Sequence, residues 1–144
     1  MALRMLAVAL ALAFAAPAPM AAAQAAAKPQ ANELASEAWL NGAWRFNWQG
    51  AQGAYVGAIR VARSAKGLEA KVDVLRANDG AYVTQTARVE IIGVGVQIDG
   101  YEVTGGNTQG WSPDNFYLTR SGDRLIGYSV DDSGNRGTKI EVFR

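Results

Sequence analysis

Carboxylates are the residues of this chain that could carry acid–base chemistry. Asp114, Asp131 and Asp132 fall in two polar connecting segments, and two carboxylates act as general acid and base only at a suitable separation. The chain contains no His and no Cys, which excludes Cys/His zinc sites, Cys-His nucleophiles and Ser-His-Asp triads. We therefore expect a protein that is not an enzyme, with no catalytic residue and no cofactor.

The segment DDSGNRG at 131–137 has the oxygen-rich composition of a calcium loop. An EF-hand loop that began at Asp131 would need Gly at its sixth position and Glu at its twelfth, where this chain has Arg136 and Val142. The segment is therefore interpreted as a hairpin turn, and no metal site is predicted.

Aromatic side chains are better placed for binding. The stretch NGAWRFNW at 41–48 puts Trp44, Phe46 and Trp48 on one face of a strand, and Arg45 and Asn47 on the other. Two interpretations remain open: the rings fill the protein interior, or they line a ligand cage. We expect Trp44 to be structural and Trp48, at the far end of the stretch, to be the ring that contacts a ligand.

Three further aromatic residues are candidates for the same site. Trp111 lies in the polar loop TGGNTQGWSPD at 104–114, where a large aromatic side chain either anchors a ligand or folds over the site as a lid. Tyr55 and Tyr82 occur in two similar segments, GAYVGAIRV at 53–61 and GAYVTQTARV at 80–89, which a duplicated hairpin or a shared way of leaving a turn could explain. Their hydroxyls could orient a ligand. The predicted ligand-binding residues are Trp48, Trp111, Tyr55 and Tyr82.

The elements that position these residues are predicted to be strands. Apolar and polar residues alternate from residue 42 onward, and Gly, Asn and Asp interrupt the pattern about every ten residues. This pattern predicts eight strands, at 43–49, 54–63, 68–76, 81–92, 94–104, 115–120, 124–130 and 138–143. We expect them to close into an antiparallel up-and-down barrel, because closure removes exposed strand edges. A β-sandwich is the alternative.

Counting the connections assigns the predicted site to one end of the barrel. The long, Gly-rich connections, which include the loop of Trp111, alternate with the short ones and therefore gather at one mouth. Binding residues are commonly found on such loops. Trp44 and Arg144 are expected side by side at the opposite end, with a guanidinium on the indole face.

The first residues resemble a secretory signal peptide. Arg4 precedes an apolar run of 12 residues that ends at Pro17, too short for a membrane anchor, which is the competing interpretation. We predict a signal peptide at 1–23, with cleavage at 27 as the alternative, a flexible leader at 24–31 and one barrel domain at 32–144. Asn32 is the expected N-cap of a short helix that places Leu34 and Trp39 as a plug in the barrel.

The charge balance limits the partners. The chain has 14 Lys and Arg and 13 Asp and Glu, and removal of Arg4 with the signal peptide makes it formally neutral. No basic cluster suits a nucleic-acid groove, so nucleic acid is not an expected partner. The protein is also not expected to be an integral membrane protein. We expect it in the periplasm or secreted.

The stretch Gly42-Ala43-Trp44 after a short helix, together with Arg144, resembles the lipocalin and wider calycin families. In these families a Gly-x-Trp lies on the first strand and an Arg near the C-terminus covers the Trp; Arg120 and Arg124 could replace Arg144 here. The resemblance implies an eight-stranded barrel that carries a small hydrophobic molecule. The families' Thr-Asp-Tyr signature is not evident in this chain, and the disulfides of many members are absent.

The predicted function is that of an exported soluble β-barrel that binds a small apolar or amphipathic ligand at its mouth. An unfilled lumen beside Trp48 and Trp111 would favour this function, and a lumen packed by Phe46 and Trp48 would argue against it. A first alternative is a protein-binding module, similar to inhibitors of secreted proteases, which would insert residues 24–31 or use an apolar patch on its outer wall. A second is a structural envelope protein without a ligand.

Overall fold

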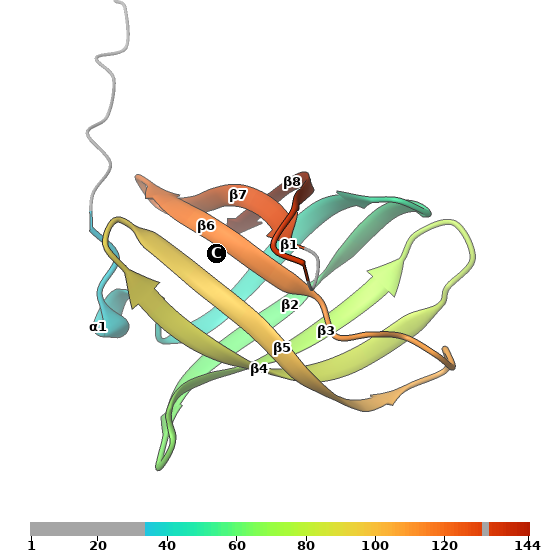
Figure 1. The fold of residues 1–144 in the computed structure, drawn as a ribbon, viewed down its shortest axis with the longest axis horizontal. Helices are drawn as coiled ribbons and strands as arrows, with labels where there is room; N and C mark the ends of the chain where they lie inside the picture. The colour runs from blue at the N-terminus through green and yellow to red at the C-terminus, as the bar shows by residue number, and fades with distance from the viewer. Residues whose placement is uncertain (1–33, 131–132) are drawn as a thin grey trace, which may run out of the picture.

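The computed structural model describes residues 34–130 and 133–144, which form a closed β-barrel (Figure 1). Each strand pairs antiparallel with its neighbours in sequence, and β1 also pairs with β8. The predicted eight-stranded up-and-down barrel is confirmed, and the β-sandwich is excluded. The elements are α1 (Glu37–Leu40), β1 (Gly42–Gly50), β2 (Gly53–Ser64), β3 (Gly67–Arg76), β4 (Tyr82–Ile92), β5 (Gly95–Gly106), β6 (Asn115–Ser121), β7 (Arg124–Val130) and β8 (Arg136–Phe143).

Alternation of apolar and polar residues sets the inner face of each strand. On β3 the apolar residues at 68, 70, 72 and 74 are buried, and the charged residues between them face outward. On β4 Val83, Ala87 and Val89 face inward and are buried, whereas Ile91, at the end of the strand, is 37 % exposed. Gln85 continues the same inward series and is fully buried.

Large side chains fill the lumen. Phe46 and Phe116 are buried, with ring centroids 6.5 Å apart, and Trp44 lies below them on β1. Gly57 on β2 makes room for Phe46, because a Cβ at this position would lie 2.5 Å from the Phe46 ring and 1.9 Å from the Asp73 carbonyl oxygen. Phe46 is therefore part of the core, which is the first of the two interpretations of this ring.

The helix α1 lies against one end of the barrel and is shorter than predicted. It begins at Glu37, and the Ser36 hydroxyl caps it by accepting a hydrogen bond from the Trp39 backbone N–H at 3.2 Å. Asn32 lies outside the described residues. Leu34 is 65 % exposed, so its predicted place in the plug is wrong, and the buried residue is Leu40. The helix is only four residues long, which leaves Leu34 outside its apolar face.

Two Arg–Trp pairs close this end of the barrel. The Arg144 guanidinium lies 4.2 Å from the Trp44 ring centroid, and Arg120 lies 4.1 Å from that of Trp39. The two indoles are 4.8 Å apart, and Trp44 Nε1 donates to the Leu40 carbonyl at 2.8 Å. The pairing expected for Trp44 and Arg144 is thus present, and Arg120 covers a second indole rather than replacing Arg144.

The opposite end carries the β1–β2, β3–β4 and β5–β6 connections, well separated from α1 (Figure 1). The β5–β6 connection is the long loop that contains Trp111. Among the described residues no helix is long and apolar enough to cross a membrane.

Candidate functional site

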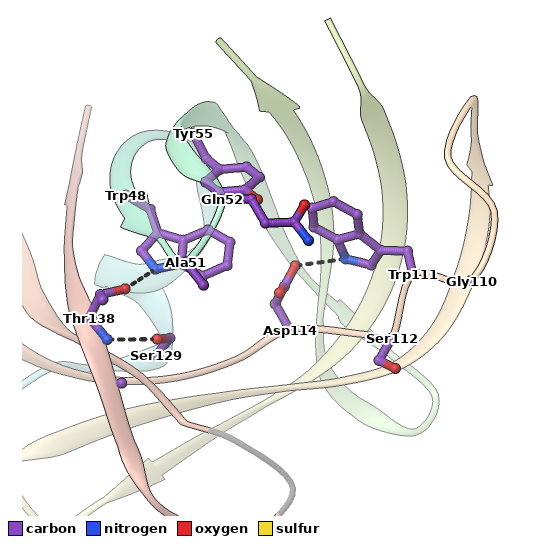
Figure 2. Close-up of a pocket in the computed structure, with 11 residues that line it drawn as sticks. Trp48, Ala51, Gln52, Tyr55, Gly110, Trp111, Ser112, Asp114, Ser129 and Thr138 are labelled. Carbon is purple, nitrogen blue, oxygen red and sulfur yellow. Dashed lines mark hydrogen bonds between the residues drawn. The ribbon is translucent and has the colours of Figure 1, made fainter. Parts of the chain in front are cut away.

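A pocket of about 380 Å³ opens at the mouth of the barrel, between the end of β1 and the β5–β6 loop. Figure 2 shows its aromatic side chains around a small set of polar groups, with Asp114 and Gln52 lying between Trp48 and Trp111. The lining residues are Trp48, Ala51, Gln52, Tyr55, Gly110, Trp111, Ser112, Asp114, Ser129, Gly137 and Thr138.

Trp48 and Tyr55 form the stacked floor of the mouth pocket. Their ring centroids are 4.7 Å apart at an interplanar angle of 29°, and β1–β2 pairing places the two residues directly opposite each other. Trp48 and Phe116 form an edge-to-face contact with ring centroids 5.4 Å apart. The base of the pocket therefore packs directly on the core inside the barrel. Trp48 Nε1 donates to the Thr138 hydroxyl at 2.9 Å, which fixes the indole to β8.

Trp111 forms the opposite wall. Its ring meets Tyr55 edge-on at 5.8 Å, and it packs against the core while remaining partly exposed. Its indole Nε1 donates to Asp114 Oδ2 at 3.1 Å. Trp111 is therefore folded over the mouth, where a lid residue would lie, and presents part of its surface to the pocket.

Gln85 attaches the Trp111 loop to the barrel. Its side-chain oxygen accepts from the Asp114 backbone N–H at 3.0 Å, and its amide nitrogen donates to the Asp114 carbonyl at 3.4 Å. Gln85 is the single polar residue among the fully buried side chains of the described segments. Gln85 was not among the predicted site residues, although its position between the inward-facing Val83 and Ala87 was a usable signal.

Asp114 is a carboxylate without a cationic partner among residues 34–130 and 133–144. Burial raises its pKa to about 6, and the hydrogen bond from Trp111 lowers it by less. No ion pair or other hydrogen bond within the described residues reaches its second oxygen, Oδ1. Every buried side-chain nitrogen or oxygen in the same residues has a partner, so Oδ1 keeps solvent-accessible surface, and Asp114 lines both the mouth pocket and an adjoining hollow.

Tyr82 does not join the other three predicted residues. It faces outward and is 48 % exposed, whereas Tyr55 faces inward and is 4 % exposed. The two Gly-Ala-Tyr-Val segments differ in which of their alternate positions face inward. Val83 faces inward on β4, whereas Val56 faces outward on β2. The predicted placement of Tyr82 beside the ligand is therefore wrong. Asp131 and Asp132 lie outside the described residues.

Tyr82 instead belongs to an apolar row on the outer wall, which we call the outer row: Val56, Leu75 and Tyr82. The residues are direct cross-strand partners on β2, β3 and β4, and are 40 %, 41 % and 48 % exposed. They border a second open pocket of about 380 Å³, the same volume as the mouth pocket.

The fold and the mouth together define a closed antiparallel barrel with a filled lumen and an aromatic, partly polar mouth. Comparison with known protein families, with curated proteins and with solved structures finds no match to this chain. The described residues contain no group of three or more side chains that could hold a metal ion. What the mouth can bind therefore follows from its own geometry.

Proposed function

We propose that the protein is an exported barrel that binds a small amphipathic molecule in the mouth pocket. The observation that carries this proposal is the group of three rings, Trp48, Tyr55 and Trp111, around an open pocket of about 380 Å³ that also has five polar side chains among its eleven lining residues. Ligand sites in proteins have this size and this mixture of aromatic walls with a few fixed polar groups. The signal-peptide pattern at 1–23 supports export.

The packed lumen is the outcome that argues against a deep ligand carrier, so we propose a ligand that lies on the lumen core rather than within it. Phe46, Phe116 and Trp48 occupy the space that a deep carrier would keep free, so the bound molecule keeps part of its surface in solvent. This differs from the deep carriage that the lipocalin resemblance implies. A molecule with one flat apolar side and one polar side suits the mouth best.

Binding rather than catalysis is proposed because of the chemistry of the pocket lining. Asp114 is its single carboxylate among the described residues, and the chain has no His or Cys to work with it. General acid–base catalysis at two sites of a substrate needs a second group.

The test uses N-phenyl-1-naphthylamine, an uncharged amphipathic dye whose emission rises in apolar sites, and native mass spectrometry of protein purified from its own host. We expect saturable dye binding, weakened about tenfold by Trp111→Ala. Tyr82→Ala is the matched control, because it removes a large exposed aromatic ring outside the mouth. Equal binding by both variants and the native chain, with no co-purified molecule, would contradict the proposal and favour a structural envelope role.

Protein binding is a second candidate, favoured by the outer row. Three large apolar side chains in register on an exposed sheet face are typical of a contact surface. Leu75→Lys tests it by cross-linking in the host envelope: a partner that is captured by the native chain and lost in this variant supports the role. Retention of every cross-link in the variant argues against it.

A further inference from the structure

The mouth pocket contains one feature that an uncharged ligand does not use, the accessible Oδ1 of Asp114. The other carboxylate oxygen, Oδ2, accepts a hydrogen bond from Trp111. The backbone N–H and carbonyl of Asp114 are both hydrogen-bonded to the Gln85 side chain. The carboxylate is thus fixed in orientation, and its second oxygen keeps accessible surface at the mouth. A fixed, partly desolvated carboxylate without a cation is a site for a positively charged donor.

The rings around Asp114 favour the same charge. Figure 2 shows the carboxylate lying between the side chains of Trp48 and Trp111. Cations are attracted to the faces of aromatic rings, and Trp is the strongest of these partners. Both indole N–H groups are already donated within the protein, to Thr138 and to Asp114, so the two indoles offer a ligand their ring surfaces rather than donors.

Two basic residues near the mouth have partners other than Asp114. Arg76 interacts with Gln52 and Tyr55 at the edge of the pocket and forms an ion pair with Asp79 at 2.7 Å. Arg136 lines an adjoining hollow that Asp114 and Trp48 also line, and its guanidinium lies 4.3 Å from the outward-facing ring of Tyr128. Neither cation compensates Asp114, whose pKa responds to burial and to Trp111 alone.

From this geometry we infer that the mouth pocket binds an organic ammonium ion: an alkylammonium group that donates to Asp114 Oδ1, carried on an apolar or aromatic body that packs against Trp48 and Trp111. The inference rests on the proposed function and specifies its ligand class. Anionic amphiphiles are disfavoured, because they would place a second negative charge against the carboxylate.

The test compares three probes with the same phenyl body: 2-phenylethylammonium, uncharged 2-phenylethanol and anionic 3-phenylpropanoate. Binding is followed by tryptophan fluorescence and by isothermal titration at pH 7.5. We expect the ammonium to bind at least about tenfold more tightly than the alcohol, as expected for a charge-assisted hydrogen bond, and the anion more weakly than both. In Asp114→Asn the preference for the ammonium over the alcohol falls to about one.

Asp123→Asn is the matched control, because Asp123 is a fully solvated carboxylate in the β6–β7 turn, at the end of the barrel opposite the mouth. It should keep the full preference for the ammonium. If Asp114→Asn does not fold, the native chain provides the second measurement. The affinity for 2-phenylethylammonium, which keeps its charge to about pH 9, should fall roughly tenfold from pH 7.5 to pH 5.0 as Asp114 takes up a proton.

The possible results separate the inference from the function on which it rests. Equal binding of ammonium and alcohol, or an affinity that is flat with pH, overturns the ammonium site and leaves an amphipathic mouth site standing. Absence of binding by all three probes at millimolar concentrations overturns both.

Discussion

Replacement of Phe46 by Ala tests whether the lumen is filled, and hence whether a ligand is confined to the mouth. Phe46 is 1 % exposed, lies 6.5 Å from Phe116 and occupies the space left by Gly57. Loss of the ring removes about 2 kcal/mol of transfer free energy. A residual cavity of roughly 80 Å³ adds about 2 kcal/mol at ~24 cal/mol per Å³. The expected loss in unfolding free energy is therefore about 4 kcal/mol.

The assay for Phe46→Ala is urea unfolding followed by tryptophan fluorescence. The midpoint should fall while the slope with urea stays unchanged, because the surface exposed on unfolding is nearly the same. Phe143→Ala is the matched control: this ring lies outward at the end of β8 and is half-buried, so its loss should cost about 1 kcal/mol. A dry cavity of this kind should also admit benzene, which would raise the stability of the variant but not of the native chain.

A loss below about 1 kcal/mol for Phe46→Ala would refute the filled lumen. The barrel interior would then be loosely occupied around Phe46, and the ligand site would extend from the mouth pocket down into the barrel. The deep carriage implied by the lipocalin resemblance would become the better proposal.

Three other perturbations probe the ends and the wall of the barrel. Arg144→Ala should lower the free energy of unfolding, measured in urea, by about 2 kcal/mol, because the guanidinium covers Trp44 and donates to the Trp39 and Asn41 carbonyls. A loss below about 1 kcal/mol, no larger than that from removing an exposed ion pair, would contradict this. Gly57→Ala should cost at least about 3 kcal/mol, because its Cβ would lie 1.9 Å from a backbone oxygen, whereas Gly105→Ala, whose Cβ has no neighbour closer than 3.9 Å, should be nearly neutral in the same assay. Asp114→Asn should be more stable than the native chain by up to about 3 kcal/mol at pH 7.5 and by only about 0.6 kcal/mol at pH 4, since a pKa raised from 3.8 to about 6 destabilises the fold only where the unfolded carboxylate is ionised. A difference independent of pH would assign the effect to packing.

The barrel could be predicted from sequence because local signals agreed along the whole chain. Alternation on β3 gives the inward face directly, and the Gly-containing connections separate the strands at regular intervals. Because each strand pairs with the next one in the sequence, successive connections lie at alternate ends of the barrel. Counting the strands therefore assigns Trp111 to the mouth, and Trp44 with Arg144 to the opposite end. The start of the helix could not be predicted in the same way, because Asn32 and Ser36 are both residue types that cap helices, and the structure begins the helix at Glu37 with Ser36 as its cap.

The residues that line the mouth pocket could not all be predicted from the alternation of apolar and polar residues. Tyr55 and Tyr82 have nearly identical local sequences, and a shift of one residue in parity sends one ring inward and the other to the outer row. The contact between Gln85 and Asp114 joins residues 29 positions apart through backbone groups, which no side-chain pattern reveals. Whether Phe46 leaves room for a ligand depends on the volume inside the closed barrel, which is set by all eight strands together.

The energetic cost of Asp114 bears on what the mouth is for. An Asn at this position could accept the Trp111 hydrogen bond without the penalty of burying a charge, and the Gln85 contacts involve only the backbone. A carboxylate that raises the free energy of the folded state, without a cation beside it in the described residues, therefore does not serve the fold. Perturbed groups of this kind gather at functional sites, where a ligand supplies the missing partner. An ammonium ion at Oδ1 would return the pKa of Asp114 toward its ordinary range and remove the penalty. The carboxylate that destabilises the ligand-free protein would then stabilise the complex. The free energies of unfolding of the bound and free proteins should therefore differ most above pH 6.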